Sequence, residues 1–190
     1  AACGDGDPAL ADAGGTAIEL LHCASLVHDD LPCFDDAAMR RGRASVHVAY
    51  GERCAVLAGD ALIVMAFETL ALAAQRNPLR LPAMLAVLAQ RVGMPGGIVA
   101  GQAWECEDWA ALPDYHRAKT GSLFAAATEL GALAAGGDPA VWRGFGEWLG
   151  EGRLGFRSAD IGAVLDLMIH DIDLVLSLAA APLSGVDAVA

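Results

Sequence analysis

The chain has 190 residues, of which 55% are hydrophobic, and a formal net charge of −12 at pH 7. This acidic balance argues against nucleic acid and anionic membrane surfaces as partners, while the length suits one domain around a single core. The five cysteines form no Cys-x-x-Cys pair, which favours a reducing cytoplasm over a disulfide framework or zinc site. Charged residues interrupt each apolar stretch before about 18 residues, so no transmembrane segment is expected.

Alanine and leucine are abundant and aromatic residues few, which favours helices over sheet. The first predicted helix spans residues 8–30, and Leu31-Pro32 should end it because the residue before proline avoids the helical region. On a regular helix Asp29 and Asp35 would point to different faces. A break after Asp30 would let the chain curl and bring Asp35 back toward Asp29.

Further helices are predicted in chain order at 45–74, 82–92, 97–109, 114–135, 140–150 and 161–181, with turns at Asn77-Pro78 and at 136–139. The second of these has an apolar face predicted from the sequence, consisting of Val56, Leu57, Ile63, Val64 and Phe67. We expect one all-α domain over residues 1–190, incomplete at its N-terminus and irregular after about residue 151. Its polar site should lie at helix ends that face the middle of the bundle.

Four carboxylates, those of Asp29, Asp30, Asp35 and Asp36, fall within eight positions at the end of the first helix. Side by side they repel one another and resist burial, unless a divalent cation such as Mg²⁺ neutralises them. The neighbouring Arg40-Arg41 pair supplies forked donors suited to phosphate. The alternatives are a helix end with solvated acids and a basic surface turn.

The run 26–35, followed by 39–42, resembles the first aspartate-rich motif of the trans-isoprenyl diphosphate synthases, the polyprenyl synthetase family. It is most similar to that of the bacterial geranylgeranyl and farnesyl diphosphate synthases. Segments 96–102 and 119–124 agree with the family in the same order. The resemblance implies an isoprenoid-synthase-type helical bundle with a central active-site cavity. It also implies a homodimer that condenses an allylic diphosphate with isopentenyl diphosphate.

The same resemblance assigns roles to single residues. It makes Asp29, Asp30 and Asp35 the ligands of Mg²⁺ and catalytic residues. It places Arg40 on the allylic diphosphate and Arg41 on the isopentenyl diphosphate.

The later segments carry further roles by resemblance. Lys119, also catalytic, and Thr120 lie near the allylic diphosphate, while the glycines before Gln102 are interpreted first as packing positions. Small residues at Ser25 and Ala24, four and five positions before the motif, imply an open chain-length pocket and a geranylgeranyl rather than a farnesyl product.

The second aspartate-rich motif of the family is degraded here. Arg157 stands at the position of its glutamine and Ile161 at that of its second aspartate, which leaves Asp160 as the best remaining metal ligand. The upstream Gly-Lys-Arg segment is absent as well. A non-catalytic synthase-like subunit or an inactive fragment therefore remains an alternative. A class I terpene cyclase and a purely structural bundle are further ones.

Overall fold

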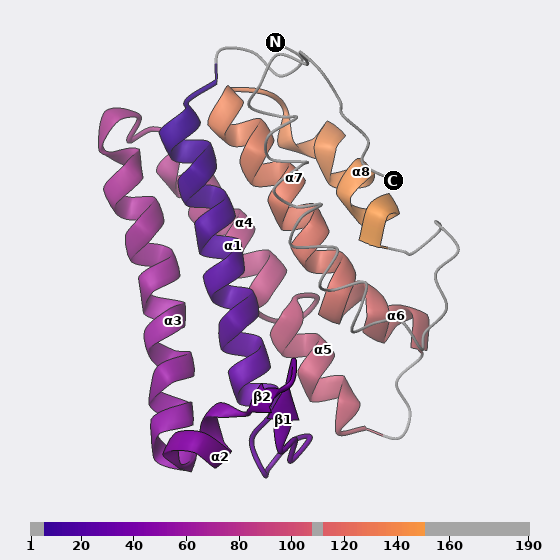
Figure 1. The fold of residues 1–190 in the computed structure, drawn as a ribbon. Helices are drawn as coiled ribbons and strands as arrows, with labels where there is room; N and C mark the ends of the chain where they lie inside the picture. Colours follow the sequence, from indigo (N-terminus) through magenta and orange to yellow (C-terminus); the bar gives the residue numbers. More distant parts are fainter. Residues whose placement is uncertain (1–5, 108–111, 151–190) are drawn as a thin grey trace, which may run out of the picture.

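The computed structural model describes residues 6–107 and 112–150, and within them the fold is a helical bundle (Figure 1). The elements in chain order are α1 (Pro8–Asp29), β1 (Met39–Arg40), β2 (Arg43–Ala44), α2 (Val46–Tyr50), α3 (Glu52–Ala73), a 3₁₀ turn η1 (Ala74–Arg76), α4 (Leu81–Val92), α5 (Ile98–Glu105), α6 (Leu112–His116), a π-helical segment η2 (Arg117–Gly121), α7 (Ser122–Ala135) and α8 (Pro139–Gly150). The all-α prediction is confirmed. The predicted helix at 161–181 and Asp160 lie outside the described residues.

Helix α1 has the bounds that its sequence predicts to within one residue. The Asp7 side chain accepts a hydrogen bond from the Leu10 amide at 3.2 Å, and Pro8 occupies the first helical turn, where its missing N–H costs nothing. The helix ends at Asp29, two residues before Leu31-Pro32 is reached. Its buried side chains include Leu10, Ile18 and Leu21 along the face toward the core.

Helix α7 is the centre of the bundle. All its residues except Leu133 are buried, which identifies a core helix rather than an amphipathic surface helix. Helix α1 packs on α7 at Gly14, where an added Cβ would lie 3.4 Å from Leu130, an ordinary contact distance. Gly136 ends α7 in the left-handed conformation with φ +74°. Figure 1 shows α1 between α3 and α7, with α8 along the outer side of α7.

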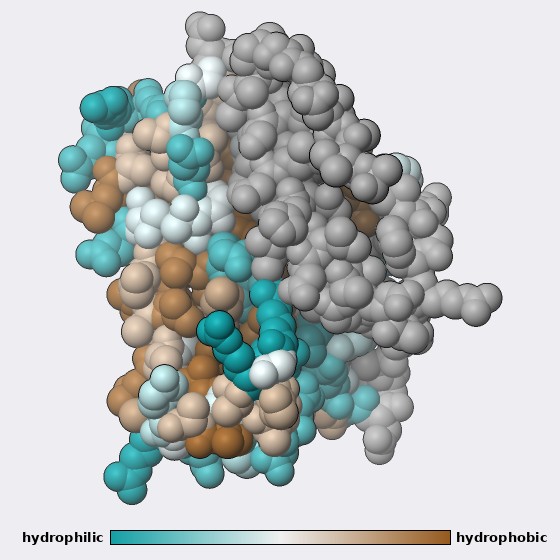
Figure 2. Space-filling view, in the orientation of Figure 1, coloured by the Kyte–Doolittle hydropathy of each residue, from teal (hydrophilic) through white to brown (hydrophobic). Residues whose placement is uncertain are grey.

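The prediction of one helix over 45–74 is wrong. Gly51 adopts φ +88° and ψ +154°, so the chain forms the short α2 and then the long α3. The predicted apolar face is also wrong, because Leu57 is 66% and Val64 65% exposed, and Val56 is exposed too. Only Ile63 and Phe67 of that set pack against the core. The exposed apolar side chains form brown patches over α3 in Figure 2.

Within the described residues, the stretch Glu52–Arg76 is long and apolar enough, by length and composition, to cross a membrane. Asp60 and Glu68 lie within this stretch, but its mean hydropathy still reaches the level of a membrane-spanning helix.

Candidate functional site

The chain curls after α1 and returns to its end. The Phe34 amide donates to the Leu31 carbonyl at 2.9 Å, and the Asp35 amide donates to the Asp29 carbonyl at 2.9 Å. Asp29 and Asp35 consequently line one cavity of about 160 Å³. The break predicted at Leu31-Pro32 therefore has the predicted effect of bringing these two carboxylates together.

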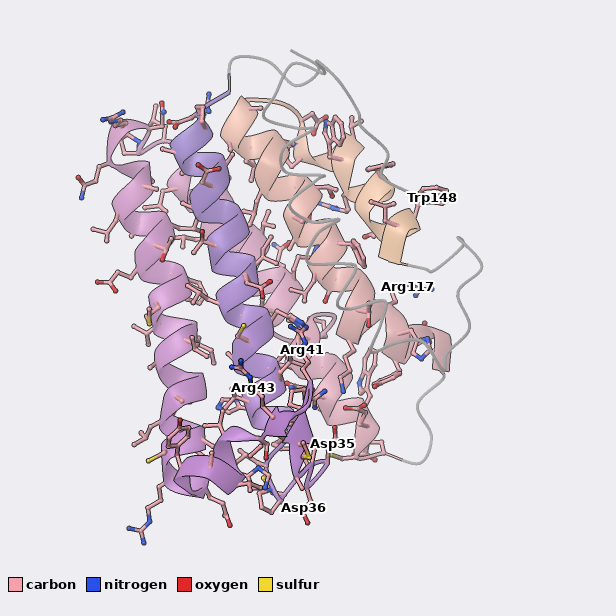
Figure 3. All side chains as sticks on the ribbon, in the orientation of Figure 1. Asp35, Asp36, Arg41, Arg43, Arg117 and Trp148 are labelled. Atoms are coloured by element: carbon pink, nitrogen blue, oxygen red, sulfur yellow. The ribbon has the colours of Figure 1, made fainter. Side chains whose placement is uncertain are left out.

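The cavity lies at the lower end of the bundle in Figure 3, where Asp35 and Arg41 are labelled. Its walls come from α1, the segment after it, the β-hairpin, α6, the π-helical segment and the start of α7. The lining residues are His22, Ser25, Leu26, Asp29, Asp35, Arg40, Tyr115, His116, Lys119, Thr120 and Leu123. Two carboxylates, two cations and apolar side chains thus meet in one hollow.

Asp29 is buried, with 4% of its surface exposed, and has two partners. The Gln102 side-chain amide donates to its Oδ1 at 2.9 Å, and Lys119 Nζ lies 3.4 Å from its Oδ2. Burial raises the pKa of Asp29, and the Lys119 charge and the Gln102 hydrogen bond offset this only in part. The sequence suggested packing for the segment before Gln102, whereas the Gln102 side chain itself holds a site carboxylate.

Asp30 is paired with Arg40 rather than with the other acids. Arg40 Nε and Nη2 both donate to its Oδ1, at 3.0 and 2.5 Å, and Nε also lies 3.3 Å from Oδ2. The hydrogen bond to Asp30 raises the pKa of Arg40. Asp30 does not line the cavity, so a ligand role for its carboxylate requires that this pair opens.

The β-hairpin that carries the arginines was not predicted. Arg40 pairs with Arg43, and the two residues between them, Arg41 and Gly42, have φ of +50° and +76°. Positive φ at both positions is what a tight two-residue hairpin turn requires. Because a non-glycine residue rarely adopts this conformation, Arg41 is held at some energetic cost, as is common at functional sites.

Lys119 lies on the π-helical segment, a distortion often found at functional sites. Its Nζ contacts Glu105 Oε2 at 2.5 Å as well as Asp29. Burial alone would lower the pKa of Lys119, but the hydrogen bond to Glu105 and the Asp29 charge outweigh burial and raise it. Tyr115 also donates to Glu105, and burial with this bond raises the pKa of Tyr115 to about 12.

A packing role for the glycines before Gln102 is confirmed at two positions. A Cβ at Gly101 would lie 2.7 Å from the Lys119 backbone nitrogen, and a Cβ at Gly97 would lie 2.5 Å from the Arg91 backbone. Helix α5 can therefore approach the π-helical segment closely, which brings Gln102 and Glu105 to the site. Glu105 and Tyr115 were missed because no short-range pattern connects them to the acidic motif.

His22 is a further lining residue that the sequence did not single out. Within the part of the chain that the structure describes, its buried Nε2 has no hydrogen-bond partner. Burial and the charges of Arg41 and Arg40 lower the pKa of His22 to about 4, so its imidazole is neutral. The sequence signal that could have identified His22 as a site residue is its spacing from Asp29. His22, Ser25, Leu26 and Asp29 lie along one face of the helix.

The two residues of the predicted chain-length pocket have different positions. Ser25 lines the cavity, and its hydroxyl donates to the His22 carbonyl at 2.7 Å. Ala24 is buried but is not among the lining residues. Thr120 lines the cavity beside Lys119.

The residues present suit Mg²⁺, although they do not form a closed cage. Within residues 6–107 and 112–150, no group of three His, Cys, Asp or Glu side chains converges on one point. Mg²⁺ commonly binds through one or two carboxylates and fills its remaining positions with water and substrate phosphate oxygens. Asp29 and Asp35, open to one cavity, match that donor set.

Comparisons with known proteins agree with this geometry. The sequence profile of the family described as "Polyprenyl synthetase" matches residues 1–152. The geranylgeranyl diphosphate synthase of Cereibacter sphaeroides is 57% identical over 159 residues, which are 84% of this chain and 54% of that protein. The enzyme of the same name from Rhodobacter capsulatus is 52% identical over the same shares. The chain thus spans about half the length of the curated relatives it matches.

Solved structures give the same fold. A geranyltransferase from Helicobacter pylori superposes with a TM-score of 0.66 at 29% identity, over 86% of this chain and 66% of that one. A second structure of the geranyltransferase, complexed with magnesium and isoprenyl diphosphate, gives a TM-score of 0.66 at 26% identity, over 86% of this chain and 65% of that one.

Proposed function

Because the chain belongs to the polyprenyl synthetase family, we propose that the protein is a prenyltransferase that condenses an allylic diphosphate with isopentenyl diphosphate to give geranylgeranyl diphosphate. The observation that carries this proposal is the joint lining of one cavity by Asp29, Asp35, Arg40 and Lys119. Carboxylates for a metal and cations for phosphate are both needed where a diphosphate must be bound and then released. The names of the curated relatives support the same reaction.

In this proposal Asp29 and Asp35 hold Mg²⁺, together with Asp30 once Arg40 turns from it to the allylic diphosphate. Bound Mg²⁺ would neutralise negative charge on the diphosphate as it departs. Gln102 keeps Asp29 directed into the cavity, and Lys119 and Thr120 bind phosphate oxygens from the opposite wall. Arg41 would bind the diphosphate of the isopentenyl substrate.

The reaction joins two carbons. The allylic carbon–oxygen bond breaks, the isopentenyl double bond attacks the resulting allylic cation, and a proton leaves for the released diphosphate. Leu26 and Leu123 line the cavity beside the charged residues and would keep water from the cation. His22 lines the same cavity, and because its pKa is lowered to about 4 its neutral imidazole would not repel the cation.

The test is a product assay on the purified protein with Mg²⁺, labelled isopentenyl diphosphate and farnesyl diphosphate. We expect a labelled C20 diphosphate and no product from farnesyl diphosphate alone. Cyclic hydrocarbon from farnesyl diphosphate alone would indicate a terpene cyclase. No turnover, together with retained Mg²⁺-dependent binding of inorganic pyrophosphate, would indicate a non-catalytic subunit.

Chain length provides a second test of the site. Ser25 lines the cavity, so with geranyl diphosphate (C10) as the allylic substrate Ser25→Phe should stop elongation at C15, whereas Ala24→Phe tests the neighbouring buried position. Chromatography of the dephosphorylated products measures both. An unchanged C20 product from both variants would show that other residues form the floor of the pocket.

We also propose a homodimer that acts in the cytoplasm. The support is an exposed apolar surface on α2 and α3, formed by Val48, Val56, Leu57, Val64, Met65 and Leu72. An apolar patch of this kind is typical of a surface that another chain covers. Light scattering should give twice the monomer mass, and the double variant Leu57→Glu/Val64→Glu should give a monomer.

A further inference from the structure

The ring of His28 occupies the position that a side chain at residue 59 would take. A Cβ built on Gly59 would lie 2.0 Å from Nε2, 2.5 Å from Cδ2 and 2.7 Å from Cε1 of His28. No real side chain is tolerated at such distances, so α3 has an open notch at Gly59 and the imidazole fills it. The last turn of α1 is thereby seated on α3.

Polar contacts complement this seat. His28 Nε2 lies 3.3 Å from the Val56 carbonyl oxygen and 3.9 Å from Asp60 Oδ1, and three quarters of the side chain is covered. Val56, Gly59 and Asp60 lie within one turn of each other on α3. The ring is therefore held by shape and by two oxygen atoms of the same helix.

The seat matters because His28 directly precedes Asp29. Neighbouring side chains on a helix point about 100° apart, so holding one side chain fixes the direction of the next. The Gln102 side chain holds Asp29 from the α5 side. The notch at Gly59 holds the same turn from the α3 side. Among the described glycines of α3, Gly59 is the position where an added Cβ would meet a side chain of α1.

We propose that His28, seated in the notch at Gly59, is a positioning residue that fixes the rotation of the last turn of α1 and so aims the Asp29 carboxylate into the cavity. This inference rests on the proposed function, because it assigns His28 a role through a residue of the proposed metal site. Partners that orient a metal ligand change metal affinity or activity by about 10- to 100-fold when they are lost.

The experiment is a double-mutant cycle with Gly59→Ala, His28→Ala and the variant that carries both. Gly59→Ala alone forces the ring out of the notch. We expect it to weaken Mn²⁺ binding, followed by electron paramagnetic resonance, by about tenfold. The double variant should bind Mn²⁺ as weakly as His28→Ala alone and no more weakly, because Gly59→Ala acts only through the ring that the other change has already removed. Additive effects of the two changes would overturn the proposal.

Gly144→Ala is the matched control. Gly144 lies on α8 with no atom within 4 Å of an added Cβ, so this change should leave Mn²⁺ affinity unaltered. If Gly59→Ala does not fold, His28→Ala and His28→Asn provide the test. Both should weaken Mn²⁺ binding while the protein remains folded. Lower thermal stability with unchanged Mn²⁺ affinity would show a purely structural contact and overturn the proposal.

A metal-free readout separates this inference from the proposed function. The side-chain amide protons of Gln102 report the direction of Asp29 through their hydrogen bond. In spectra recorded without metal, Gly59→Ala and His28→Ala should each shift these signals, and the double variant should show no further shift than His28→Ala. This result would support the inference even if the product assay showed no turnover, and unshifted signals would refute it.

Discussion

Glu129 and Asp29 are both buried carboxylates, with 1% and 4% of their surface exposed, yet they lie in different regions and are compensated differently. Glu129, on α7, accepts hydrogen bonds from two arginines. Arg91 Nε donates to its Oε2 at 2.8 Å, and Arg143 Nε donates to its Oε1 at 2.6 Å. Among the described residues, Asp29 at the cavity contacts one amide and one ammonium, the latter at 3.4 Å. The comparison shows a structural acid in the core that is compensated by two guanidinium groups, and an acid at the site that is compensated less fully.

This difference has a physical consequence. The charge of Glu129 is compensated inside the fold by a guanidinium group at each of its two oxygens. Asp29 lines a cavity, and burial raises its pKa because its partners do not fully offset desolvation. Readiness to bind a cation is therefore linked to incomplete compensation in the free protein.

The largest expected effect comes from Asp29→Asn. We expect prenyl transfer to fall by about 100- to 1,000-fold, the scale for losing one charge-stabilising group. Stability at pH 7, measured by urea unfolding in EDTA, should stay equal or increase. The reason is that an acid whose folded pKa is raised destabilises the fold above that pKa, and this penalty shrinks as the pH falls. A large loss of stability would contradict the comparison.

Glu129→Gln should have the opposite profile. It leaves Arg91 and Arg143 without their shared charge, and we expect about 2–3 kcal/mol of unfolding free energy to be lost, less than for a fully buried pair because both arginines reach solvent. Turnover per folded molecule should be unchanged within about twofold. Urea unfolding followed by circular dichroism measures the first quantity, and a drop in turnover of folded enzyme would refute the division of roles.

Acid should destabilise the site region through His22. Its pKa is lowered to about 4 from an ordinary 6.5, so the unfolded chain takes up a proton between these values while the folded protein does not. The stability contribution present above about pH 6.5 is lost as the pH falls, by about 2 kcal/mol at pH 5. His22→Gln should flatten the pH dependence of the unfolding free energy over this window.

The smallest effect is expected for Arg143→Ala. Its side chain is nearly half exposed, so the ion pair with Glu129 is screened by water and should contribute only about 0.5–1 kcal/mol. Arg91→Ala should cost more, because Arg91 is mostly covered and also contacts Glu147 at 3.3 Å. Equal losses of unfolding free energy for both variants would show that burial does not decide how much the Arg91–Glu129 and Arg143–Glu129 ion pairs contribute to stability.

Local signals in the sequence predicted α1 and the acidic motif well. Asp7 and Pro8 start α1 and Leu31-Pro32 ends it through contacts within a few residues, and the same break returns Asp35 to Asp29. Such short-range geometry is readable from residue type alone. The roles given to Asp29, Asp30, Asp35, Arg40 and Lys119 stay predictions until the site is tested.

The sequence failed where the outcome depends on distant parts of the chain. Apolar residues occur around most of α3, so their spacing could not show which side faces α1. Gly51 looked like an ordinary helical position, yet it adopts a positive φ and separates α2 from α3. Glu105 reaches the site only because Gly101 lets α5 approach Lys119 closely, a contact between segments far apart in sequence.

The burial of α7 also sets the order in which parts of the molecule open. Amide protons exchange with solvent only when their hydrogen bonds break, and the most buried segments need the largest opening. Leu123 to Ala135 should thus be the last amides to take up deuterium, while those of the exposed segment 33–44 exchange within seconds to minutes. A ligand that spans the cavity would add protection to the second group by covering it, so exchange mass spectrometry could locate its binding directly.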